Sequence, residues 1–337
     1  MDNKYYPMNS AEVLDQVLSV YKKSFLKQLV VSTVFSIIFF VGFYLLLIVG
    51  IFVLVAGFAS AGLGTGIGAG MIITIGALLI FLVLGISIYE ALTATGVALI
   101  TKHTFLGEYC DVWGVLKASF KKILIATTAA LANLIVLIPV IALAAFLVYI
   151  YIVTIIGFGN MEGTPGGPII AATIVLILLM LALSLVLATI TMMSMSVAIF
   201  EGRWFFGAVM RSFQLVKQDF MRIMGLVAIW FLITFGITIS LETLFSVGPS
   251  LLMYFFPEEA AGFVFLSTFI FGSLFSIAVG VVVAPLSGIF STMVYINQRI
   301  KLEGMDIELN LNALEVKRNY DERNEHDIRE RHERGVE

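Results

Sequence analysis

Six long stretches of the chain carry almost no charged side chains, and this pattern limits the fold more than any other feature. The hydrocarbon core of a bilayer is about 30 Å thick, so an α-helix needs about 20 apolar residues to cross it. Every stretch exceeds that length, and only 13% of the chain is charged, against about 25% in soluble proteins. We therefore predict an all-α membrane protein with a bundle of six transmembrane helices. The stretches are residues 29–57, 70–101, 123–157, 168–200, 223–247 and 261–297.

The 20 lysines and arginines all lie at the same end of the predicted helices. Four precede the first stretch, four lie between the second and third, four lie between the fourth and fifth, and eight follow the sixth. The other three connections contain none. Lys and Arg in short loops stay on the cytoplasmic side of a membrane. The distribution predicts a multi-pass protein of the plasma (inner) membrane with both termini in the cytoplasm.

One short motif recurs in three of these basic segments. The pattern K-x-[SD]-F-x-[KR]-x-[LM] matches residues 22–29, 117–124 and 217–224. Apolar residues at helical spacing accompany the motif, as in residues 11–28 and 204–221. We expect three copies of one unit, each an interfacial amphipathic helix followed by a two-span hairpin. The predicted segments are an amphipathic helix at 1–28, a hairpin at 29–101, helix-plus-hairpin units at 102–200 and 201–297, and a charged tail at 298–337.

The motif residues have the properties of membrane-surface anchors. Phe suits the apolar boundary, while Lys and Arg extend their charged ends to the headgroups. Each basic residue near an anionic surface gains about 1 kcal/mol of attraction. The alternative is that the amphipathic stretches are helical extensions that pack on the ends of the bundle. The predicted headgroup-anchoring residues are Lys22, Phe25, Lys27, Lys117, Phe120, Lys122, Lys217, Phe220 and Arg222.

Two polar side chains deep inside the predicted spans, Glu90 and Asn133, are candidates for a site. Glu90 precedes Lys102 by 12 residues, which is about 18 Å along a helix. Asn133 follows Lys122 by 11 residues, or about 16 Å, so the two side chains lie at a similar depth. Polar groups within spans are candidates for function. Glu90 forms a structural hydrogen bond with Asn133 or a hydroxyl, takes part in proton or substrate transfer, or lies at the interface.

The sequence contains no motif of a known catalytic site. Its single cysteine, Cys110, excludes an intrachain disulfide and a thiolate metal cluster. The zinc-protease, serine-hydrolase and P-loop motifs are missing, and without a basic block nucleic acid is not an expected partner. We therefore expect no enzymatic activity, no cofactor and no metal site.

The tail differs from the rest of the chain in composition. Residues 298–337 hold 19 of the 43 charged side chains. Beyond residue 317 apolar side chains are too few to form a core. We predict that this part is largely disordered or a solvated helix, with binding of a partner as the alternative.

Two segments resemble a known family. VAIFEGRWFFGAVMRSFQLVK at 197–217 and YINQRIKLEGMDIEL at 295–309 are similar to the membrane domain of bacterial glycerophosphoryl diester phosphodiesterases and to related uncharacterised multi-span families. The resemblance implies a membrane module only, because the chain has no room for the catalytic barrel that gives the family its name.

Two functions are consistent with these features. The first is a non-catalytic scaffold or accessory module that engages lipid headgroups, anionic ones in particular, or a membrane protein partner. The alternative is a transporter or exporter of a small solute or lipid, with a polar site at mid-membrane formed by Glu90 and Asn133.

Overall fold

The computed structural model consists almost entirely of helices. It describes residues 6–61, 67–158, 167–255, 261–305 and 307. Within these ranges no β-strand occurs, which confirms the predicted all-α fold. The predicted disorder beyond residue 317 falls outside the described residues. The elements are α1 (Ser10–Ala61), α2 (Ile67–Leu106), α3 (Val112–Lys121), α4 (Ile123–Phe158), α5 (Gly167–Thr191), α6 (Ser194–Glu201), α7 (Phe206–Val216), the 3-10 turn η1 (Lys217–Asp219), α8 (Phe220–Phe255) and α9 (Ala261–Glu303).

Six of the described helical segments are long and apolar enough to cross a membrane, which agrees with the six predicted spans. At the basic end, α2 continues beyond the predicted apolar stretch to Leu106, and α9 continues to Glu303. These extensions carry basic side chains to the region where the helices meet. The segments are Ser10–Phe52, Ile75–Leu106, Ile123–Val153, Ala171–Glu201, Phe206–Leu244 and Ala278–Glu303.

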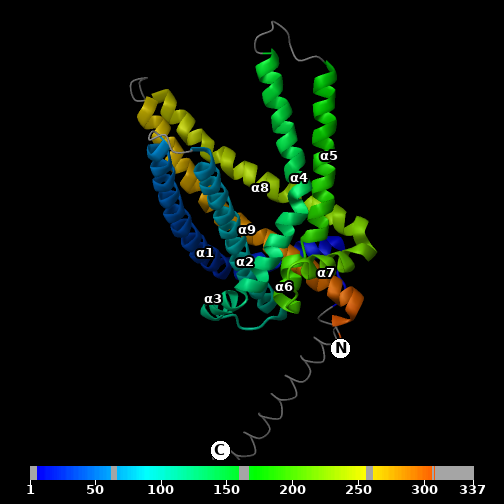
Figure 1. Cartoon of the computed structure of the whole chain (residues 1–337). Coiled ribbons are helices and arrows are strands. Elements are labelled where there is room, and N and C mark those ends of the chain that lie inside the picture. The colour runs from blue at the N-terminus through cyan, green and yellow to red at the C-terminus, as the bar shows by residue number, and fades with distance from the viewer. Residues whose placement is uncertain (1–5, 62–66, 159–166, 256–260, 306, 308–337) are drawn as a thin grey trace, which may run out of the picture.

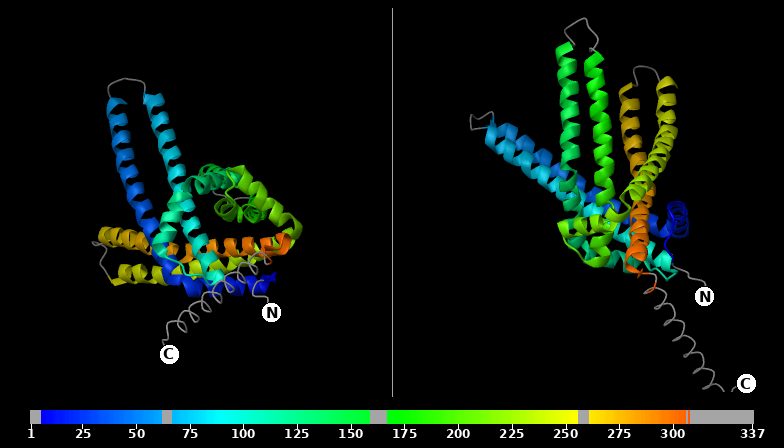
Figure 2. Two further views of the ribbon diagram at one scale, coloured as in Figure 1. Left: turned by 90° about the horizontal axis from the view of Figure 1, so that it is seen from below. Right: turned by 90° about the vertical axis from the view of Figure 1, so that its right-hand side faces the viewer.

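The long helices form three hairpins, α1 with α2, α4 with α5, and α8 with α9, which fan out from one end (Figures 1 and 2). The short helices α3, α6 and α7 lie at that end, which we call the base. The main cluster of buried apolar side chains combines residues of α1, α2 and α4 with residues of α6 to α9. The base is therefore where the three hairpins form a common core.

Two glycines allow helices to approach closely within this core. A Cβ atom added at Gly96 of α2 would lie 2.5 Å from Val31 Cγ1 of α1. A Cβ atom added at Gly288 of α9 would lie 2.6 Å from Val97 Cγ1 of α2. Small residues at such positions are typical of helix pairs in membranes, where close packing drives association.

The helices that precede the spans differ among the three hairpins. Helix α1 begins at Ser10 and passes residue 28 without a break, so no separate helix ends at the predicted boundary. Helix α3 is distinct from α4, and Asp111 caps it by accepting hydrogen bonds from the backbone N–H groups of Trp113 and Gly114. Helix α7 is separated from α8 by the 3-10 turn η1.

Candidate functional site

The structure does not join the two polar residues predicted inside the spans. Glu90 is exposed on α2, and among the described residues its carboxyl group forms no hydrogen bond or ion pair. Asn133 of α4 is instead linked to α6, because Ser194 Oγ donates a hydrogen bond of 2.7 Å to its side-chain oxygen. The partner of Asn133 therefore comes from the helix that follows α5, not from α2.

Glu90 shares a side of α2 with a residue that packs against another helix. Residues seven positions apart lie nearly above one another on a helix, and Val97 packs directly against Gly288 of α9. Glu90 thus lies on the same side of α2 as Val97, two turns nearer the start of the helix, where its side chain is exposed.

The first basic residue of each predicted anchoring motif is available at the surface. Lys22 of α1, Lys117 of α3 and Lys217 of η1 are all exposed. They form no ion pair with any described residue. These three side chains have the freedom to reach a charged surface.

The last basic residue of each motif contacts another part of the base. The Lys27 ammonium lies 5.7 Å from the centre of the Tyr109 ring. Lys122 Nζ donates a hydrogen bond of 2.6 Å to the carbonyl oxygen of Ile199. These two cations therefore connect segments of the protein, in addition to any contact with lipid.

Arg222 of α8 forms the third of these connections. Its guanidinium donates to the carbonyl oxygen of Met8 and to Ser10 Oγ, both at 3.2 Å. Asn297 of α9 holds the same segment, accepting from Met8 N at 2.8 Å and donating to Met8 O at 3.1 Å. The chain that precedes α1 is thus attached to both helices of the last hairpin.

The motif phenylalanines have different surroundings. Phe25 is half-buried and meets the edge of Tyr21, with the ring centres 5.4 Å apart. Phe220 packs against the main core. Phe120 is exposed on one side, while its ring contacts Phe35 at 5.9 Å. Of the three, Phe120 is therefore the one most open to a surrounding membrane.

The apolar residues of the amphipathic stretches are divided between the protein core and the surface. In α1, Val13 and Val17 are buried against the other helices. In α3, Trp113 is 75% exposed and lies on the same face as Lys117 and Phe120. The first stretch therefore packs on the bundle, whereas the second also presents apolar surface outwards.

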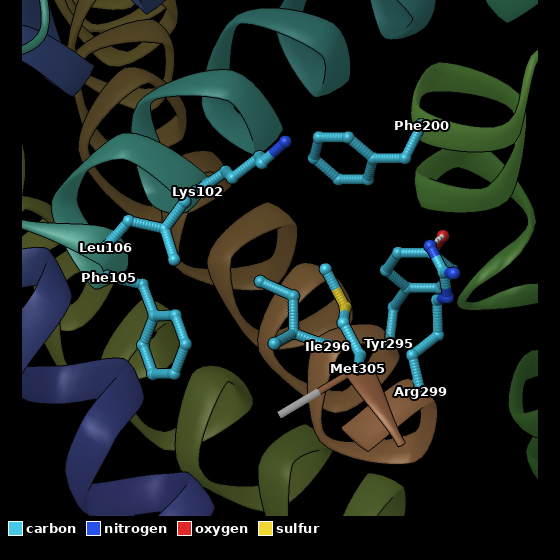
Figure 3. Close-up of a pocket in the computed structure, with 8 residues that line it drawn as sticks. All are labelled: Lys102, Phe105, Leu106, Phe200, Tyr295, Ile296, Arg299 and Met305. Carbon is cyan, nitrogen blue, oxygen red and sulfur yellow. Dashed lines mark hydrogen bonds between the residues drawn. The ribbon is translucent and has the colours of Figure 1, made fainter. Parts of the chain in front are cut away.

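A pocket of about 170 Å³ lies at the base between α2, α6 and α9. Figure 3 shows Lys102 of α2 extending towards the ring of Phe200 on α6, with Tyr295 and Arg299 of α9 on the opposite side. The Phe200 and Tyr295 rings are stacked, with centres 5.6 Å apart. The remaining lining residues are Phe105, Leu106, Ile296 and Met305.

The Lys102 ammonium lies 5.6 Å from the centre of the Phe200 ring. Close by, burial lowers the pKa of Lys122, and the charges of Lys102 and Lys121 lower it further. Three ammonium groups therefore produce a positive potential near the pocket.

An ion-pair network adjoins the pocket and shares Tyr295 and Arg299 with it. Glu201 of α6 accepts hydrogen bonds from Arg211 of α7 and from the Tyr295 hydroxyl, at 3.0 and 3.2 Å. Glu303 of α9 is paired with Arg211 and, at 2.8 Å, with Arg299. This network connects α6, α7 and α9 beside the pocket.

Local sequence patterns do not indicate this pocket, because Lys102 and Arg299 have the positions expected of residues that only orient a membrane protein. They are far apart in the chain, and each follows an apolar stretch in the usual way. The one available signal was that Phe200 and Tyr295 lie in similar positions at the ends of two predicted spans.

Within the described ranges, no three His, Cys, Asp or Glu side chains are grouped as a metal site would require. Comparisons with known proteins give no match for this chain: no family model, no curated protein and no solved structure is similar to it.

Proposed function

We propose that this protein is a non-catalytic membrane module whose base engages anionic lipid headgroups and thereby acts as a scaffold or accessory. The observation that carries the proposal is the outer face of α3. Trp113, Lys117 and Phe120 lie side by side there and are exposed, while Val115 and Ser119 on the opposite face are buried. Trp favours the membrane–water interface, and Lys gains from anionic headgroups.

Helix α7 supports the same function. Phe206, Met210 and Phe213 are exposed at helical spacing, and the exposed Lys217 follows on the same side. The buried face of α7, with Ala208 and Leu215 among its residues, packs into the core. Two helices of the base thus have one apolar face inside the protein and a second apolar face, flanked by lysine, outside it.

The proposal includes a base built from three repeated units. In support, the last cation of each motif makes a contact that joins distant segments of the base. Lys27 of the first unit contacts the second unit, and Arg222 of the third contacts the first, whereas Lys122 contacts the end of its own unit. The contacts are Lys27 with Tyr109, Lys122 with Ile199, and Arg222 with Met8.

We further propose that the base faces the cytoplasm of a cell with a plasma (inner) membrane, as the basic residues predict. Cys110 is the single cysteine, so a Cys110→Ser protein accepts one new thiol at a chosen site. A membrane-impermeant thiol reagent applied to intact cells should modify Asn160→Cys and leave Lys117→Cys unmodified. The reverse result would contradict this orientation.

The resemblance of residues 197–217 and 295–309 to the phosphodiesterase membrane domain also stays a prediction.

The headgroup function is tested by lipid preference. The purified wild-type protein, reconstituted with phosphatidylcholine and phosphatidylglycerol, should retain phosphatidylglycerol in native mass spectrometry. Trp113→Ala combined with Lys117→Gln should reduce that retention several-fold. Phe146→Ala, an exposed aromatic residue in the outer half of α4, is the control and should have no effect. Equal retention of both lipids by the wild-type protein would refute the proposal.

Transport is the second candidate function, and the exposure of Glu90 is the observation that favours it. A charged carboxylate that faces lipid in the middle of a span costs about 2.5–3.5 kcal/mol. A water-filled path beside Glu90 would remove that cost and would offer a solute a route into the membrane. In the Cys110→Ser background, a water-soluble thiol reagent should then modify Glu90→Cys more rapidly than Ile88→Cys. Ile88 is exposed two residues away on a different face of α2. Equal, slow modification of both would contradict a water-filled path.

A further inference from the structure

We propose that the pocket between α2, α6 and α9 is a binding site for a phosphoryl anion, with Lys102 and Arg299 as its cationic ligands. This goes beyond the proposed headgroup surface, because the pocket does not include the outer face of α3. The phosphoryl group belongs either to the headgroup of a lipid or to a free phosphate.

Lys102 contributes a charge that the protein itself does not neutralise. Its ammonium group extends into the pocket and lies 5.6 Å from the centre of the Phe200 ring (Figure 3). None of the carboxylates in the described part of the chain forms an ion pair with it. The nearby ammonium group of Lys122 adds repulsion. An anion bound here would relieve that repulsion and give Lys102 a partner.

Arg299 contributes hydrogen-bond donors in a fixed orientation. Its Nε donates to Glu303 at 2.8 Å, and its Nη1 donates to the Tyr295 hydroxyl at 3.4 Å. These contacts hold the guanidinium at the edge of the pocket. Nη2 has no partner among the described residues, so it is available to a ligand. Arg is suited to phosphate because its donors match the geometry of the oxygen atoms.

The two carboxylates close to the pocket do not oppose an anion strongly, because arginines already neutralise them. Glu201 is paired with Arg203 and Arg211, at 3.2 and 3.0 Å. Glu303 is paired with Arg211 and Arg299. Together with Lys102, Lys121 and Lys122, cations outnumber these two carboxylates among the described residues around the pocket. The local field therefore favours a negative ligand.

The size and position of the pocket specify the kind of anion. Pockets for drug-sized molecules have volumes of about 300–1,000 Å³, whereas this one has about 170 Å³. It fits a phosphoryl group with a short substituent better than a larger solute. Lys102 and Arg299 lie near the ends of the segments Ile75–Leu106 and Ala278–Glu303, at the level expected for lipid phosphates. The apolar side chains of Ile296 and Met305 would contact the substituent.

The test compares two probes on the full-length protein. In detergent, inorganic phosphate is titrated at constant ionic strength while thermal unfolding is followed. In mixed nanodiscs, retention of phosphatidylglycerol is measured by native mass spectrometry. Lys102→Gln should weaken binding of the effective probe by about tenfold or more, since it removes a charged hydrogen-bond donor. Lys102→Arg should restore most of the binding and shows that the fold tolerates change at this position.

Lys23→Gln is the matched control, because it removes the same charge from an exposed position outside both the pocket and the outer face of α3. Saturable stabilisation by inorganic phosphate that depends on Lys102 identifies free phosphate as the source. Retained phosphatidylglycerol that depends on Lys102 identifies a lipid headgroup.

The proposal is overturned if neither probe binds saturably, or if Lys102→Gln and Lys23→Gln have equal effects. Loss of lipid in the combined Trp113→Ala and Lys117→Gln variant, with full retention in Lys102→Gln, would also overturn it, because the outer face of α3 would then be the binding element. Loss only in Lys102→Gln would establish the pocket even if the α3 surface had no role.

Discussion

The base and the outer halves of the hairpins consist of similar apolar residues but are packed differently. At the base, Met193, Ile289 and Met293 are completely buried. In the outer halves, Phe52 is 72% exposed and Leu178 is 60% exposed, because the hairpins diverge there (Figure 2). Apolar character alone therefore does not bring these helices together.

Polar and small side chains account for the difference. In lipid, an apolar side chain gains little by leaving the hydrocarbon tails for another helix, so association depends on close packing and hydrogen bonds. The base provides both. Ser196 and Thr292 connect α6 with α9 at 3.3 Å, and Ser212 of α7 donates to the carbonyl oxygen of Ile190 at 2.6 Å. Gly288 admits a neighbouring side chain.

The largest effect should come from removing core volume at the base. Met293→Ala should destabilise the protein by about 2–5 kcal/mol, because the buried side chain loses its packing partners and leaves a cavity. Leu178→Ala in the outer half of α5 should change stability by less than about 0.5 kcal/mol. Unfolding in detergent micelles measures both. Similar losses in the two variants would contradict the proposed division between base and outer halves.

Glycine substitutions test the close packing of helices at the base against the looser packing in the outer halves. Gly288→Ala should cost about 1–3 kcal/mol, since the new methyl group overlaps Val97 of α2. Gly236→Ala in α8 meets no atom within 4 Å and should stabilise its helix by up to about 1 kcal/mol. The measurement is again unfolding in detergent. Opposite signs are expected, and a shared sign would show that the base is not closely packed around Gly288.

A smaller effect should separate the two cations of one motif copy. Arg222→Met should cost about 1–2 kcal/mol, because the carbonyl group of Met8 loses its charged donor. It should also speed hydrogen exchange in the first turn of α1. Lys217→Met removes an exposed charge and should leave both quantities nearly unchanged. Exchange that is equally fast in both variants would indicate that the Arg222 contact does not hold the chain before α1.

The smallest effect should be a rise of stability with pH in the alkaline range, caused by a lysine where the three hairpins meet. The pKa of Lys122 is lowered in the folded protein, so between that pKa and the ordinary value of 10.5 the unfolded state binds more protons. Stability should therefore rise with pH across this window by a contribution from Lys122. Lys102→Gln removes one of the causes and should reduce the rise. Unfolding measured at a series of pH values for both proteins tests this, and an unchanged slope would contradict it.

Some of the fold and of the candidate site could be predicted from local patterns. The length of the uncharged stretches predicted six spans, and the structure contains six helices of this type among its described residues. The similar depth of Glu90 and Asn133 followed from helical rise alone. Their partners did not, because the direction in which a side chain points depends on how two helices are rotated against each other.

The roles of the basic residues show the same limit. Lys117 and Lys122 belong to one motif copy and looked equivalent as anchors. In the structure Lys117 is exposed, while Lys122 donates to the carbonyl oxygen of Ile199. The α6 segment that receives this bond lies far along the chain, so no local spacing could indicate it.

Six apolar helices with basic residues at one end follow from local composition, because a span must satisfy its backbone hydrogen bonds within itself and each segment therefore carries its own signal. The packing of the helices, in contrast, sets where the hairpins meet, which cations remain exposed and which residues share a pocket, as Lys102 and Arg299 do. Those outcomes depend on contacts between distant helices. In lipid most apolar helix faces have a similar tendency to associate, so small and polar residues decide which faces pack together.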